Sequence, residues 1–141
     1  MEQKGLYFTL SSFFIMTKKE GSAVFIFHQN KVLLLLRKKE PYKDCWCPPG
    51  GKLDGDESAA ACALRETLEE VNLHVTLEQS LGSYVNPETG FLNHFFATTV
   101  FSGTVNNNEP EKHETVAWFS LDQVPDKLNW AMRKWFELQS Q

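Results

Sequence analysis

The chain has 141 residues, with 14 lysines and arginines against 18 aspartates and glutamates, and its formal net charge is −4. This length suits one domain with its own hydrophobic core. The negative balance excludes a protein that works mainly by neutralising nucleic-acid phosphates, although a metal ion could still bring a small phosphate-bearing ligand to it. Three cysteines cannot close a disulfide framework, so we expect a reducing, cytoplasmic location.

The first apolar run, LYFTLSSFFIM at residues 6–16, is too short to span a bilayer, which takes about 20 apolar residues. It also lacks the small residues of a signal-peptide cleavage site. We therefore expect residues 1–20 to form an N-terminal extension or arm and residues 21–141 to form the main domain. No membrane partner is expected.

Two apolar runs, 23–28 and 32–36, flank the turn residues Gln29 and Asn30 and predict a pair of neighbouring strands. A charged loop follows. It leads to the Pro-Pro-Gly-Gly turn at residues 48–51, which no helix could accommodate.

Residues 57–71 have helical periodicity. Asp56 or Ser58 is expected to cap the N-terminus of this helix, and Asn72 to end it in the left-handed conformation. The residues expected on its buried face are Ala60, Ala61, Leu64, Leu68 and Val71.

The rest of the chain alternates strands with one more helix. Strands are predicted at 73–77, 93–101 and 115–119, with a loop at 106–110, and residues 128–138 predict a final amphipathic helix. Strands interrupted by one central and one terminal helix indicate an α/β layer fold with a mixed sheet.

Three acids of the central helix, Glu66, Glu69 and Glu70, are spaced i, i+3 and i+4, so their carboxylates share one face. Hard oxygen donors clustered in this way suit Mg²⁺ or Mn²⁺, which also bind substrate phosphates. A solvated acidic helix face is the alternative, and the carboxylates alone favour it. The preceding glycines, Gly50 and Gly51, shift the balance because they let the backbone approach a ligand closely.

Residues 51–73 resemble the Nudix box, G-x5-E-x7-R-E-U-x-E-E-x-G-U, in which U is a bulky apolar residue. The positions that match in register are Gly51, Glu57, Arg65, Glu66, Glu69 and Glu70. Two positions depart from it: Thr67 replaces an apolar residue, and Asn72 replaces the second glycine. Neither departure touches a proposed metal ligand.

The resemblance implies an α/β/α sandwich with a mixed β-sheet, and an enzyme that hydrolyses a nucleoside diphosphate linked to another group. By position, the implied ligands of Mg²⁺ or Mn²⁺ are the Gly50 carbonyl, Glu66, Glu69 and Glu70. Arg65 is implied to orient them, and Glu69 or Glu66 to act as general base. Glu57 is implied to support the site without touching the metal.

Similarity to MutT-like nucleoside triphosphate pyrophosphatases extends beyond the box, to Trp46, to residues 109–114 with Trp118, and to residues 128–132. It implies a small-molecule substrate, a nucleoside triphosphate or an oxidised or modified dNTP, cleaved to monophosphate and pyrophosphate. The residues expected to touch substrate are Gly51, Lys52, Glu114 and Trp130, with Glu111 as a supporting acid. His28, His74 and His113 are expected to be surface or structural residues.

Two alternatives stay open. A pyrophosphatase of ADP-ribose or a nucleotide sugar often carries a proline some way after the box, and Pro87 lies near that position but not on it. A non-catalytic Nudix module that binds a nucleotide or a protein usually loses box acids, whereas this chain keeps all four. A monomer or a homodimer is expected, and the preferred base stays open.

Overall fold

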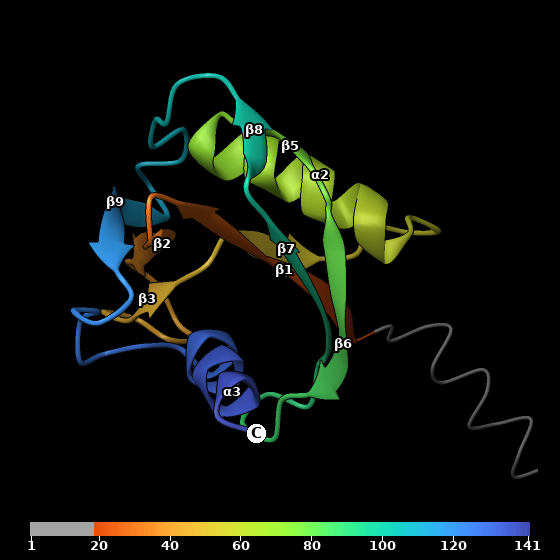
Figure 1. Cartoon of the computed structure of the whole chain (residues 1–141). Coiled ribbons are helices and arrows are strands. Elements are labelled where there is room, and N and C mark those ends of the chain that lie inside the picture. The colour runs from red at the N-terminus through yellow and green to blue at the C-terminus, as the bar shows by residue number, and fades with distance from the viewer. Residues whose placement is uncertain (1–18) are drawn as a thin grey trace, which may run out of the picture.

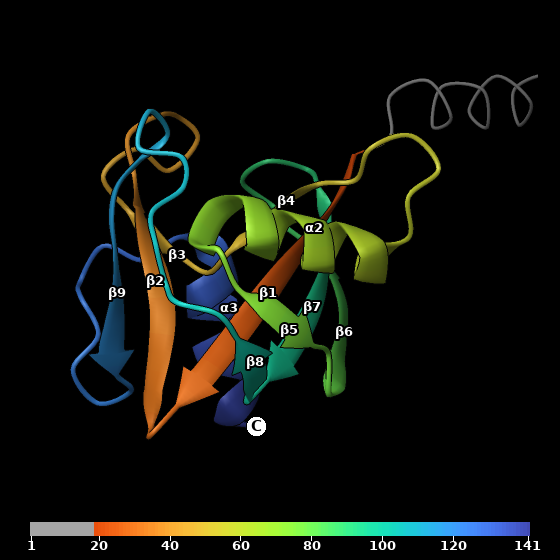
Figure 2. The ribbon, with the colours of Figure 1, turned by 90° about the horizontal axis from the view of Figure 1, so that it is seen from above.

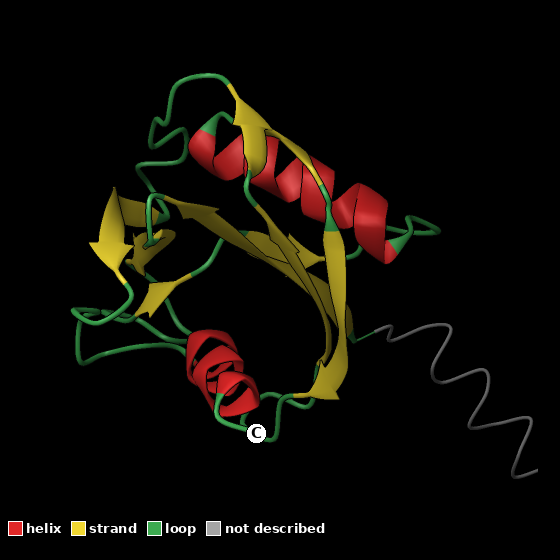
Figure 3. Ribbon diagram, viewed as in Figure 1, coloured by secondary structure: helices red, strands yellow, loops and turns green. Residues whose placement is uncertain are grey.

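The computed structural model describes residues 19–141. The expectation of an arm at residues 1–20 therefore falls almost entirely outside the described residues. A curved β-sheet lies between helix α2 (Ala59–Val71) and helix α3 (Trp130–Gln139) (Figures 1 and 3). Over residues 19–141, no helix combines the length and the apolar composition needed to cross a membrane.

The strands, in chain order, are β1 (Glu20–His28), β2 (Lys31–Arg37), β3 (Trp46–Cys47), β4 (Gly50–Lys52), β5 (His74–Thr76), β6 (Gln79–Val85), β7 (Leu92–Thr98), β8 (Val100–Ser102) and β9 (His113–Ser120). The main sheet runs β3-β2-β1-β7-β6, with β4 also paired to β1 and β9 to β2, while β5 and β8 form a separate pair. β1 and β7 pair in parallel, whereas β1 pairs with β2 and β4, and β7 with β6, in antiparallel orientation. The predicted mixed sheet between helices is confirmed.

The hairpin between β1 and β2 closes as the sequence predicts. His28 pairs with Lys31, so Gln29 and Asn30 alone form the turn, with φ values of 51° and 63°. Positive φ at both central positions matches the right-handed twist of the flanking strands.

The sheet has a hydrophobic core on each face, because β1 alternates its side chains between them. Phe25 packs on the α3 side with Met132 and Trp135. Val24 and Ile26 pack on the α2 side, in the cluster that also contains the helix residues Ala63 and Val71.

The predicted buried face of the central helix is wrong except at Val71. Leu64 and Leu68 are 44% and 38% exposed. The residues that α2 buries are Cys62, Ala63, Thr67, Glu70 and Val71. The two polar residues of this face can be buried because both are hydrogen-bonded. Thr67 donates its hydroxyl to the Ala63 carbonyl over 2.7 Å, and Glu70 accepts the Gly50 N–H over 2.8 Å.

The helix ends match the sequence more closely. Ser58, rather than Asp56, caps α2 by accepting the Ala61 N–H over 3.0 Å, so the helix begins two residues later than predicted. Asn72 ends it in the left-handed conformation with φ 66°, as predicted.

Several strand bounds differ from the predictions. β6 (Gln79–Val85) was not predicted, because its exposed polar residues do not alternate with apolar ones. The predicted strand 93–101 is divided at Thr99 into β7 and β8, and β9 begins at His113 rather than at residue 115.

Candidate active site

Strand β4 lies close to both β1 and α2, and its glycines permit this. A Cβ atom on Gly50 would overlap the carbonyl oxygen of Ser22 in β1. A Cβ atom on Gly51 would lie 2.5 Å from the carboxyl carbon of Glu66. The two glycines therefore set the distance between the turn and the acids of the helix.

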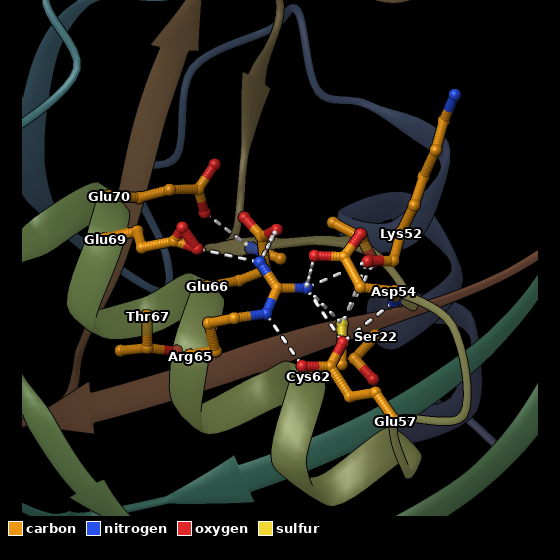
Figure 4. Close-up of polar contacts among 12 residues, drawn as sticks. Ser22, Lys52, Asp54, Glu57, Cys62, Arg65, Glu66, Thr67, Glu69 and Glu70 are labelled. Carbon is orange, nitrogen blue, oxygen red and sulfur yellow. Dashed lines mark hydrogen bonds and ion pairs between the residues drawn. The ribbon is translucent and has the colours of Figure 1, made fainter.

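Arg65 joins three box acids (Figure 4). Its Nε and Nη2 donate to the two carboxylate oxygens of Glu57 over 2.7 and 2.8 Å. Its Nη1 donates to Glu66 over 2.8 Å and to Glu69 over 2.7 Å. Since one nitrogen binds both acids, their carboxylates converge on one point of the helix face. The orienting role of Arg65 stays a prediction.

The acids differ in electrostatic environment. Hydrogen bonds from Arg65 lower the pKa of Glu57 to about 2. Burial raises the pKa of Glu66 and raises the pKa of Glu70 well above its ordinary value. A raised pKa marks carboxylates whose charge is poorly compensated by their surroundings.

The donor chemistry fits a divalent cation. Glu66, Glu69 and Glu70 offer hard carboxylate oxygens on one helix face, which is the set that Mg²⁺ and Mn²⁺ prefer. A bound cation would stabilise the charged forms that burial disfavours at Glu66 and Glu70. The Gly50 carbonyl stays a predicted ligand, since Gly50 binds the Glu70 carboxylate through its N–H and not through its carbonyl.

A cleft of about 650 Å³ opens over these acids, a volume typical of small-molecule sites. The predicted site residues that line it are Gly50, Gly51, Lys52, Arg65, Glu66, Glu69, Glu70 and Trp130. Glu57, Glu111 and Glu114 do not line it. Glu57 instead binds the Arg65 guanidinium from outside the cleft. The positions of Glu111 and Glu114 do not support the contacts predicted for them.

Besides Arg65, four cations line the cleft: Arg37, Lys39, Lys52 and Lys112. Arg37 is held in place, since its Nε donates to the Pro41 carbonyl over 2.6 Å. Only Lys52 was predicted. Arg37 ends β2, whereas Lys39 and Lys112 lie outside the strands, and the sequence gives no sign of which way these three side chains face.

Other cleft residues offer an aromatic and amide surface. Phe91 lies under the Lys52 ammonium at 5.4 Å, and Trp130 packs on Phe95 with ring centroids 5.9 Å apart. The amide side chains of Asn86 and Asn93 line the same cleft. Such surfaces suit a flat base with polar edges.

Two further residues meet the box acids. His113 is only 1% exposed and its Nε2 lies 3.6 Å from an oxygen of Glu70. Glu109 lies in the same cluster. Of the surface and structural positions expected for His113, the structure excludes the surface one, because β9 begins at this residue and its side chain is buried. The predicted strand begins only at residue 115, so it did not indicate that His113 is buried.

A model of the NUDIX domain matches residues 17–139. The chain belongs to the Nudix family. An oxidized purine nucleoside triphosphate hydrolase of Danio rerio is 29% identical over 132 residues, which cover 90% of this chain and 83% of that relative. An ADP-ribose pyrophosphatase of Methanocaldococcus jannaschii is 30% identical over 100 residues, or 68% of this chain, but this chain spans only 58% of that relative.

The fold of this Nudix chain has close counterparts. The crystal structure of a MutT NUDIX hydrolase from Burkholderia pseudomallei is similar, with a TM-score of 0.75 and 31% identity, over 84% of this chain and 95% of that one. The chain is thus a MutT-like Nudix hydrolase, of the family that acts on pyrophosphate bonds with a divalent metal.

Proposed function

We propose that this Nudix hydrolase cleaves a nucleoside triphosphate, including oxidised or modified dNTPs, to the monophosphate and pyrophosphate in the presence of Mg²⁺ or Mn²⁺. The observation that carries the proposal is the composition of the cleft. Converging carboxylates, four cations besides Arg65 and an aromatic surface line one space of about 650 Å³. Each suits one part of such a substrate: its metal, its phosphates and its base.

The phosphate chain would meet Lys52, Lys112 and Arg37. A triphosphate carries several negative charges beside the box acids, so cations and metal together are needed to balance it. Arg37 can offer planar N–H donors to phosphate oxygens, while the lysines act as point charges.

The hydrolytic step needs a positioned water and a base. When bound, the metal neutralises phosphate charge and lowers the pKa of a water. Glu69 or Glu66 would accept the proton of that water, since both carboxylates converge at the Arg65 guanidinium. Arg65 keeps them in place, and Glu57 in turn holds Arg65.

A second candidate substrate is ADP-ribose, favoured by the relative from Methanocaldococcus jannaschii that bears this activity in its name. Both candidates share the pyrophosphate bond, the metal and the base. They differ in the group beyond the phosphates, and the relatives from Methanocaldococcus jannaschii and Danio rerio divide between them.

The test incubates the full chain with Mg²⁺ and a panel of nucleotides: the ordinary and 8-oxo triphosphates, ADP-ribose and a nucleotide sugar. Pyrophosphate and orthophosphate are detected separately. The proposal expects monophosphate and pyrophosphate from a triphosphate. Turnover of ADP-ribose alone would replace it with the second candidate, and no turnover of any compound would favour a binding module.

A further inference from the structure

Glu70, the last of the box acids, forms a cluster with Glu109 and His113, two residues outside the box. One potential ligand atom from each residue lies within 4.8 Å of the others. Glu70 and His113 are 6% and 1% exposed and Glu109 is partly buried, so the cluster is not an acidic surface patch.

The His113 imidazole has no hydrogen bond that explains its burial. Its Nδ1 is buried without a partner among the described residues. Its Nε2 lies 3.6 Å from Glu70 Oε2, longer than a hydrogen bond. Nε2, which faces Glu70, is therefore not hydrogen-bonded to the described residues, so its lone pair is available to an ion, while Nδ1 on the opposite side of the ring has no partner of its own.

The distance between His113 Nε2 and Glu70 Oε2 fits two ligands of one metal ion. At metal–ligand distances of about 2.1 Å, neighbouring ligands of an octahedral ion lie roughly 3 Å apart and opposite ligands roughly 4.2 Å apart. The 3.6 Å between Nε2 and Oε2 falls between these limits. Glu70 is already fixed for the role, because its Oε1 accepts the Gly50 N–H and its Oε2 faces the histidine.

The backbone holds the cluster before any ion binds. The loop between β8 and β9 passes the C-terminal end of α2 (Figure 2). Asn108 donates its backbone N–H to the Glu70 carbonyl over 3.1 Å. The His113 N–H donates to the Glu109 carbonyl over 3.0 Å, which keeps these two residues on one turn.

We propose that His113 supplies an imidazole nitrogen to a divalent ion that it shares with Glu70 and Glu109, and that this nitrogen makes the position favour Mn²⁺ and later transition ions over Mg²⁺. The proposal rests on the proposed function only in taking the cleft to hold metal. Imidazole suits transition ions, whereas Mg²⁺ prefers an all-oxygen shell. The box acids Glu66 and Glu69 offer only oxygen.

The first measurement detects the nitrogen directly. The metal-free full chain receives substoichiometric Mn²⁺, and pulsed electron paramagnetic resonance records the modulation from a coordinated ¹⁴N nucleus. The wild type should show this modulation. The exposed His74→Asn control should keep it, and His113→Asn should lose it. Bound Mn²⁺ without ¹⁴N modulation in the wild type would overturn the proposal, whether or not the variant folds.

The second measurement compares affinities by calorimetry. His113→Asn should reduce the ratio of Mn²⁺ to Mg²⁺ affinity by about tenfold or more, whereas Glu109→Gln should weaken both ions without changing the ratio. A folded His113→Asn chain with an unchanged ratio would refute the assignment.

These metal-binding experiments can fail independently of the activity test of the proposed function. Pyrophosphate release with Mg²⁺ but no ¹⁴N modulation would remove the role of His113 and leave the function standing. A ¹⁴N signal without turnover of any nucleotide would do the reverse.

Discussion

Arg65 and Glu57 are joined by two parallel hydrogen bonds, from Nε to Oε2 over 2.7 Å and from Nη2 to Oε1 over 2.8 Å. This bidentate pair fixes the plane of the guanidinium. The remaining nitrogen, Nη1, is thereby aimed at Glu66 and Glu69. Glu57 thus acts on the candidate metal ligands through Arg65 without lining the cleft itself.

The ion pair between Arg65 and Glu57 predicts that the free energy of unfolding depends on pH. The folded-state pKa of Glu57 is about 2, below its ordinary value of 4.5, so folding favours the carboxylate. Its contribution is complete above about pH 4.5 and is lost as the pH falls toward 2. Glu57→Gln should therefore be less stable than wild type in urea unfolding at pH 7, with a difference that shrinks at pH 3. The exposed Glu137→Gln serves as control, and a pH-independent difference would contradict the ionic origin.

Glu69 is expected to act in catalysis rather than in folding. It is exposed on α2, and among the described residues its side chain hydrogen-bonds only to Arg65. Glu69→Gln should lower kcat by about 10²–10⁴-fold, the range of a general base. The unfolding midpoint should stay close to that of Glu137→Gln. Near-normal turnover would remove Glu69 from the site, and Glu66→Gln measured alongside would show which of the two acids takes the proton.

Local patterns carried the sequence predictions that the structure confirms. The two-residue turn at Gln29 and Asn30 and the left-handed end at Asn72 depend on residues close in sequence. Glu66, Glu69 and Glu70 lie near one another because helical spacing brings them to adjacent positions on α2.

The errors arose where distant segments meet. The inner face of α2 carries Glu70 because the Gly50 N–H, 20 residues earlier, pairs with it. The spacing of apolar residues contains no information on such a hydrogen bond, so it predicts Leu64 and Leu68 on the buried face. His113 meets Glu70 only because β9 pairs with β2 and its loop is bonded to the end of α2.

Two glycines offer a test of how closely the turn must approach the acids. Gly51→Ala would place a Cβ 2.5 Å from the Glu66 carboxyl carbon, so the acid must move and kcat should fall while the fold persists. Gly55→Ala meets open space but has a φ of 50°, so it should lose stability by about 1 kcal/mol with kcat unchanged. Steady-state kinetics and urea unfolding of both variants separate the effects. Equal kcat losses in the two would show that strain, and not the position of Glu66, matters.

Asn72 stands where the Nudix pattern has glycine, and its φ of 66° explains why the exchange is tolerated. Its side chain also donates to the Thr104 carbonyl over 3.0 Å. Asn72→Gly keeps the conformation and loses only this exposed bond, so its free energy of unfolding should stay within about 1 kcal/mol of wild type. Asn72→Ala loses the bond and also strains the backbone, so it should be less stable than Asn72→Gly by roughly 1–2 kcal/mol. Urea unfolding of the two variants isolates the backbone contribution, because both lack the amide. Equal stabilities would mean that the left-handed residue does not limit the end of α2.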